Sequence, residues 1–162
     1  MTSGLTAGRG SHNRAVFTAP PRRYAVVLPY HPEGDLEPGC ETWELLAKPL
    51  RPSADVFALV SPWGVLPEAR FGAWGSLMEP DLDLTGRQAA RDAADRIRAW
   101  LDSYGGRYQR IALLAEGPLM NAWTQGARGT RSASRVKILK AGGALGMRHP
   151  RLRRELAASV SP

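Results

Sequence analysis

The sequence predicts a three-layer α/β fold with a mainly parallel sheet, and three short apolar runs carry that prediction. They cover residues 23–29, 54–60 and 108–115. Short runs that are apolar at nearly every position are typical of strands buried on both faces. Helix-length segments separate these runs, and this alternation is typical of parallel strands joined by helical crossovers. We therefore expect the three strands to lie side by side in one sheet.

The elements before residue 105 follow from local composition. The first run ends at Pro29 and is followed by a loop over 30–39 that is rich in Pro and Gly. A short helix is expected over 41–46, ahead of the second strand. A longer helix is expected over 87–104, because its apolar residues recur at steps of three and four, with Thr85 as its N-cap.

The segments after residue 105 are predicted with the same reasoning. After the third strand, a helix begins within 119–123, a weak helical stripe covers 132–141, and a last basic helix covers 150–160. This gives three parts: a disordered basic arm over 1–21, an α/β domain over 22–123 and a basic helical tail over 124–162.

Charge is unevenly distributed along the chain, whose formal net charge is +7. Residues 24–123 carry an excess of acids, whereas residues 124–162 carry nine basic side chains and one acid. This segregation is typical of polyanion binding, although a solvated basic tail fits it as well. The nine candidate phosphate ligands are Arg128, Arg131, Arg135, Lys137, Lys140, Arg148, Arg151, Arg153 and Arg154.

Several classes of protein are excluded by what the sequence lacks. It contains no apolar run near the roughly 20 residues of a membrane helix and no apolar leader, so no membrane association is expected. Cys40 is the single cysteine, which fits a reducing, cytoplasmic location. Walker, dinucleotide-binding and zinc motifs are absent, so we expect neither a metal nor a cofactor.

The ends of the predicted strands supply the candidate ligand site, because parallel strands place their carboxyl ends at one edge of the sheet. Asp81 and Asp83 precede a helix and have the chemistry to hold a base edge or act as a general base, and His31 is the other candidate catalytic group. Capping and dipole matching at the helix are the alternative explanation of the two acids. The candidate ligand-binding residues are Pro29, Tyr30, Ser61, Pro62, Trp63, Gly64 and Thr85.

The block over 60–86 resembles the core domain of archaeosine synthase, and a related domain accompanies archaeal tRNA-guanine transglycosylases. The resemblance rests on a Ser-Pro-x-Gly-x-x-Pro turn at 61–67, an acidic element ending in Thr85-Gly86, and the amphipathic helix after it. It implies a uracil-DNA-glycosylase-like fold and work on 7-deazaguanine in tRNA, so tRNA is favoured over DNA as the nucleic-acid partner. The family's catalytic Cys and Lys motif after the first strand is missing, since this chain has Leu28-Pro29-Tyr30-His31 there.

Three functions follow from these observations. The leading expectation is a domain that binds a modified purine, or the nucleic acid carrying it; a catalytic version would be a transferase or hydrolase acting on a deazaguanine-type base. A non-catalytic module that binds nucleic acid through its basic C-terminal segment is the second. The third is a small-molecule biosynthetic enzyme, which predicts no affinity for polyanions.

Overall fold

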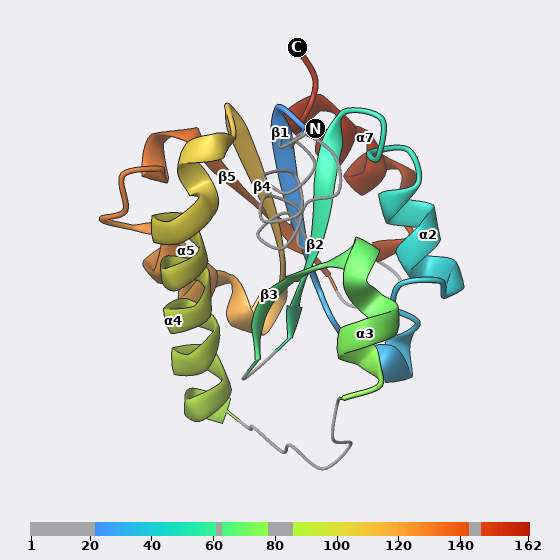
Figure 1. Cartoon of the computed structure of the whole chain (residues 1–162), viewed down its shortest axis with the longest axis horizontal. Helices are drawn as coiled ribbons and strands as arrows, with labels where there is room; N and C mark the ends of the chain where they lie inside the picture. Colours follow the sequence, from blue (N-terminus) through green and yellow to red (C-terminus); the bar gives the residue numbers. More distant parts are fainter. Residues whose placement is uncertain (1–21, 61–62, 78–85, 143–146) are drawn as a thin grey trace, which may run out of the picture.

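The computed structural model describes residues 22–60, 63–77, 86–142 and 147–162, which form a five-stranded sheet flanked by helices (Figure 1). Four strands run parallel, and β3 pairs antiparallel with β2 at one edge, in the order β3-β2-β1-β4-β5. The α/β class and the mainly parallel sheet are therefore confirmed. The strands are β1 (Tyr24–Pro29), β2 (Ala54–Val60), β3 (Gly64–Pro67), β4 (Arg110–Glu116) and β5 (Val136–Ala141).

Helices cover both faces of the sheet, which confirms three layers (Figure 1). One face packs against α2 (Glu41–Ala47), α3 (Phe71–Gly75) and α7 (Pro150–Ser159). The other face packs against α4 (Gly86–Tyr104) and α5 (Met120–Ala127). Single 3-10 turns complete the chain: η1 (Pro32–Gly34), η2 (Glu68–Arg70), η3 (Gly105–Arg107), η4 (Gly117–Leu119) and η5 (Ala133–Arg135).

The central strand β1 explains why the apolar runs are continuous rather than alternating. Val26 and Leu28 belong to the core under α2 and α7, whereas Ala25 and Val27 belong to the core under α4 and α5. All four side chains are fully buried. A strand covered on both faces requires apolar residues at every position, so its sequence has no period of two.

The structure corrects the expectation of a basic helical tail over 124–162. The expected boundary falls inside α5, and the helix expected over 132–141 is replaced by β5, which pairs with β4. Leu139 and Ala141 of β5 are buried in the same core as Leu152 and Leu156 of α7. The segment therefore completes the sheet and covers one face of it, rather than trailing from a finished domain.

Two elements lie in what the sequence predicts as a loop. The four-residue strand β3 and the five-residue helix α3 are both short, and Gly and Pro lie among their residues. These residues break the periodic patterns on which sequence-based prediction depends. The expected disordered arm over 1–21 and the expected N-cap Thr85 lie outside the described residues. No helix in the described ranges has the length and apolar character that a membrane span requires.

Candidate functional site

The carboxyl ends of the four parallel strands gather at one edge of the sheet, which we call the carboxyl edge. Pro29 of β1 is in register with Leu59 of β2, and Glu116 of β4 is in register with Ala141 of β5. From β1 the chain continues to β2 on one side and later returns to β4 on the other side. The order in which strands are added to the sheet therefore reverses between β1 and β4. Open α/β sheets bind ligands in the crevice at such a switch point.

A polar cluster follows β1 at this edge. The Tyr30 hydroxyl donates to Glu37 Oε1 at 3.0 Å, and Cys40 Sγ donates to Glu37 Oε2 at 3.7 Å. Burial and the neighbouring Glu37 carboxylate raise the pKa of Tyr30 to about 12 and also raise the pKa of the Cys40 thiol. Both groups are therefore held in their neutral forms. Sequence reasoning missed Glu37, because no motif links it to either partner.

His31 has a structural task in this loop. It is the N-cap of η1, where its Nδ1 accepts the Gly34 N–H at 3.1 Å, and its backbone forms a bridge with Leu36. With Nδ1 accepting, the proton of the neutral ring lies on Nε2. The ring is exposed, so Nε2 can donate to a ligand at the carboxyl edge.

The other candidates near this edge differ in accessibility. Pro29 is buried, and Tyr30 packs edge-on against Trp74 with ring centroids 5.4 Å apart, so neither offers a free side chain. Trp63 is 49% exposed, directly ahead of Gly64, whose φ of +118° requires glycine. Ser61, Pro62, Asp81, Asp83 and Thr85 lie outside the described residues.

Glu116 and Lys140 bring charge to the ends of β4 and β5. A Cβ added to Gly117 would lie 3.3 Å from Lys140 Cε, so this lysine extends beside the turn that follows β4. The carboxylate of Glu116, at the last position of β4, can accept hydrogen bonds from a base, and the ammonium group can hold an anion. Sequence reasoning had assigned Lys140 to a tail and had not considered Glu116 as a ligand.

The nine basic residues expected to contact phosphate do not form one surface. Arg148 lies 3.6 Å from Asp35 and 3.3 Å from Glu41 and donates to Thr42 Oγ1 at 3.2 Å, so its charge is already balanced. Arg135 donates to the Tyr108 carbonyl and to Ser132 Oγ. These two side chains stabilise the fold. Lys137, Arg151, Arg153 and Arg154 belong to β5 and α7, and Arg151 forms an ion pair with Glu155.

A second group of arginines lies at the opposite edge, where the parallel strands begin; we call it the amino edge. Arg23 donates to Gln109 Oε1 at 3.1 Å, and Arg110 donates to the Ser161 carbonyl at 2.8 Å. The loop after α5 lies beside η3, since Ser132 Oγ would be 2.3 Å from a Cβ on Gly105. The exposed arginines of this edge come from three separate segments and include Arg22, Arg23, Arg110, Arg128 and Arg131.

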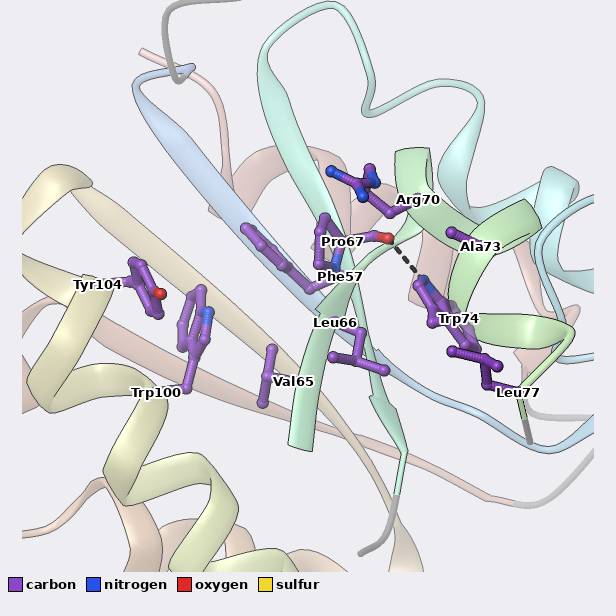
Figure 2. A pocket seen from close by; sticks show the side chains of 10 residues that line it. All are labelled: Phe57, Val65, Leu66, Pro67, Arg70, Ala73, Trp74, Leu77, Trp100 and Tyr104. Carbon is purple, nitrogen blue, oxygen red and sulfur yellow. Dashed lines mark hydrogen bonds between the residues drawn. The ribbon is translucent and has the colours of Figure 1, made fainter. Parts of the chain in front are cut away.

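An apolar cavity of about 390 Å³ lies away from both edges, along β3 (Figure 2). Trp100 and Tyr104 of α4 line one side of it, and Trp74 and Leu77 line the other. Sequence reasoning predicted neither β3 nor α3, so it did not bring Trp74 and Trp100 together. The antiparallel pairing of β3 with β2 is what does so.

Comparison with known proteins found no matching family model, no matching curated protein and no matching solved structure.

Proposed function

We propose that this domain has a uracil-DNA-glycosylase-like fold and binds a deazaguanine-type purine, or the tRNA that carries it, at the carboxyl edge of its sheet. The observation that carries the proposal is the register that brings the Tyr30–His31 loop and Glu116 to the two sides of the switch point. Glu116 then accepts from the N–H groups of the base, and His31 Nε2 donates to its carbonyl. Trp63 offers an exposed ring for stacking.

The described residues support binding more strongly than catalysis. A nucleophilic Cys40 would need a lowered thiol pKa, yet burial and Glu37 raise it. The Nδ1 of His31 is engaged in capping η1, which leaves only Nε2 for a ligand. We therefore propose a binding role, and a transferase or hydrolase activity remains the catalytic version of the same proposal, with Asp81 and Asp83 as its candidate acids.

Isothermal titration calorimetry with 7-deazaguanine and guanine tests the proposal. Glu116→Gln and Asp81→Asn each remove one carboxylate expected to hold the base edge, so both should weaken binding by about tenfold or more. Asp102→Asn, on the exposed surface of α4, and Glu155→Gln, on α7, are matched controls that should bind as the parent does.

Two results would decide against this function. A parent protein that binds neither base nor tRNA removes the purine proposal and favours the small-molecule enzyme. Equal affinity of the Glu116→Gln and Asp102→Asn variants would place the ligand elsewhere. Nucleoside mass spectrometry of tRNA and DNA from a strain lacking the gene adds a test in the cell, since the proposal expects a lost or accumulated deazaguanine-type nucleoside.

A second candidate function is docking onto nucleic acid without catalysis. The arginines of the amino edge support it, rather than a basic tail. The partners that Arg23 and Arg110 have in the structure are a neutral amide and a neutral carbonyl, so these interactions leave both charges unbalanced. The Asp55 carboxylate at this edge accepts from the Tyr108 hydroxyl and the Arg22 N–H. The helices that end at this edge have the negative ends of their dipoles there, and these also favour cations. This effect is an alternative explanation for the arginines that involves no nucleic acid.

Fluorescence anisotropy with labelled tRNA at several salt concentrations separates these explanations. Arg128→Ala combined with Arg131→Ala should lower the dependence of log K on log salt by about two, because each phosphate contact contributes about one. The matched pair Arg151→Ala and Arg154→Ala, on α7, should leave this salt dependence unchanged. Equal effects of the two pairs would mean that the arginines act only through overall charge.

A further inference from the structure

Hydrogen bonds join the segments that carry the exposed arginines of the amino edge. The Gln109 N–H donates to the Arg23 carbonyl at 2.8 Å, which brings the beginning of β1 beside the beginning of β4. Arg135 donates to the Tyr108 carbonyl at 3.0 Å and to Ser132 Oγ at 3.2 Å, which holds the loop after α5 beside the same place. The basic surface formed in this way, which we call the arginine surface, carries Arg22, Arg23, Arg110, Arg128 and Arg131.

The charges of the arginine surface are not neutralised by acids. In the part of the chain that the structure describes, none of its arginines forms an ion pair. Asp55 lies at the same edge but accepts from the Tyr108 hydroxyl at 2.8 Å and from the Arg22 backbone N–H at 3.2 Å. Guanidinium groups offer several donors in one plane, which suits phosphate oxygens. The surface therefore has the charge and the donors that a phosphate backbone requires.

Two of these arginines are held in position by neutral partners. Arg23 donates to Gln109 Oε1 at 3.1 Å, and Arg110 donates to the Ser161 carbonyl at 2.8 Å. Each bond fixes a long side chain and leaves its charge and its other N–H donors available. Fixed donors favour a partner whose phosphates are also fixed, because neither side then loses much conformational freedom on binding. The phosphates of a duplex have a regular spacing, whereas those of a flexible single strand do not.

The aromatic residues near the arginine surface are not placed to stack on bases, as proteins that bind single strands require. Tyr24 and Tyr108 are 4% and 1% exposed. Tyr104 lines the cavity along β3, where the Arg107 guanidinium lies over its ring at 5.3 Å from the centroid. The exposed Trp63 directly precedes Gly64, which pairs with the carboxyl end of β2, so it lies toward the other edge. The arginine surface thus offers donors for phosphates without a platform for bases.

We propose that the arginine surface binds the sugar–phosphate backbone of a double-stranded nucleic-acid stem rather than a single-stranded loop. This contact rests on the docking function proposed for the amino edge, and it specifies which part of the nucleic acid is held. Proteins recognise double-stranded RNA mostly through phosphates and 2′-hydroxyls, with little reading of base sequence. Binding should therefore depend on strandedness and on salt, and should be indifferent to sequence.

The stem would lie at the opposite end of the strands from the proposed purine site. Strand β1 has six residues, which span about 20 Å. A stem on the arginine surface therefore does not itself place a base at the carboxyl edge, and the two contacts can be measured separately. Glu116→Gln, which is expected to weaken purine binding, should leave the affinity for a stem unchanged.

Fluorescence anisotropy on the full chain tests the proposal with an RNA duplex of about 16 base pairs, the length that a double-stranded RNA-binding domain spans, and with oligouridine of the same length. The duplex should bind at least about tenfold more tightly at equal salt. Because the higher charge density of a duplex alone favours it somewhat, the preference must depend on this surface. Arg128→Ala with Arg131→Ala should reduce it, whereas Arg151→Ala with Arg154→Ala, on α7, should retain it.

Gln109→Ala tests the fixed geometry, since it keeps every charge and releases only the Arg23 side chain. It should weaken binding of the duplex by about threefold or more and leave binding of oligouridine unchanged. Gln88→Ala, at an exposed glutamine of α4, is the control and should change neither. Equal losses for both probes in the Gln109→Ala variant would show that the position of Arg23 does not select a duplex, and would contradict the proposal.

The outcomes separate this proposal from the docking function on which it rests. Oligouridine that binds as tightly as the duplex, with both depending on Arg128 and Arg131, overturns the preference for a stem and leaves docking in place. A duplex preference that both arginine pairs reduce equally also overturns it, because charge density would then be the cause. Absence of binding to either probe contradicts the docking function and the stem contact together.

Discussion

The Arg51 side chain joins two elements of the fold, α2 and η2. Its guanidinium donates to both oxygens of Glu44 on α2 and to both oxygens of Glu68 on η2, at 2.6 to 2.8 Å. Glu68 also accepts from Trp43 Nε1 at 2.9 Å. Bidentate contacts of this kind are among the stronger protein hydrogen bonds, so Arg51 fixes η2, and the end of β3 before it, against α2.

Arg51→Met should lower the free energy of unfolding by about 1–2 kcal/mol, measured in urea at neutral pH. This is less than several charged hydrogen bonds would give, because Arg51 and Glu44 are more than one third exposed and solvent screens them. Arg151→Met, which breaks an exposed i,i+4 pair with Glu155 on α7, should cost less than about 0.5 kcal/mol. Equal costs would show that the double bidentate geometry adds nothing.

The same variant should change how stability depends on pH. Hydrogen bonds from Arg51 hold the pKa of Glu44 below its ordinary value of 4.5. A lowered folded-state pKa contributes stability that is present above the unfolded pKa and is lost as the pH falls through the folded one. The parent should therefore lose this contribution below about pH 4.5, whereas Arg51→Met should show a flatter profile there in the same urea titration.

At the residue scale, sequence reasoning located the loop after β1 but not the residues that its side chains contact. Tyr30 and His31 do follow the first strand as predicted, yet the hydrogen bond to Glu37 depends on how the intervening turn folds back. Arg148 shows the same limit, because its partners Asp35 and Glu41 are more than 100 residues away in sequence. Such contacts are set by tertiary packing, which periodicity does not record.

At the scale of elements, β5 shows why a weak helical stripe was misleading. Its apolar residues are nearly consecutive, and a short run of that kind fits either a helix or a strand. Pairing with β4 makes this segment a strand, because each residue from Val136 to Ala141 has a partner on β4. The basic residues that made the segment resemble a tail lie on exposed positions of an element that is otherwise part of the core.

Leu156→Ala on α7 should lower the free energy of unfolding by about 2–4 kcal/mol, as expected for a leucine truncated in a packed core. The side chain is 1% exposed and lies in the core with Leu139 of β5. Arg154→Ala, two residues earlier on α7 and exposed, is the control and should change stability by less than about 0.5 kcal/mol. If Leu156→Ala has no effect, α7 does not pack as described.

At the scale of the whole molecule, stability should decrease from the centre of the sheet to its β3 edge. The backbone of β1 is bonded on both sides and covered by both helical layers, so the amides of Val26 to Leu28 should exchange with solvent hydrogen only on global unfolding. The Val65 amide, which faces outward, should exchange orders of magnitude faster. Hydrogen exchange followed by mass spectrometry or NMR checks this, and uniform protection would contradict it.

The sequence predicted the centre of the fold better than its margins. The runs over 23–29, 54–60 and 108–115 correspond to β1, β2 and β4, the three strands in the middle of the sheet. Strands β3 and β5 lie at the edges, where one side lacks a neighbour and the apolar signal is shorter or mixed with lysines. The predicted gathering of strand ends was correct, although part of the candidate site lies outside the described residues.

The hydrogen bond from Arg110 to the Ser161 carbonyl has a practical consequence. Arg110 is in register with Tyr24, so the beginning of β1 and the residues after α7 lie near one another at the amino edge. A purification tag joined after Pro162 therefore departs from the side opposite the proposed ligand site. Surface tethering through such a tag should leave the carboxyl edge facing the solution.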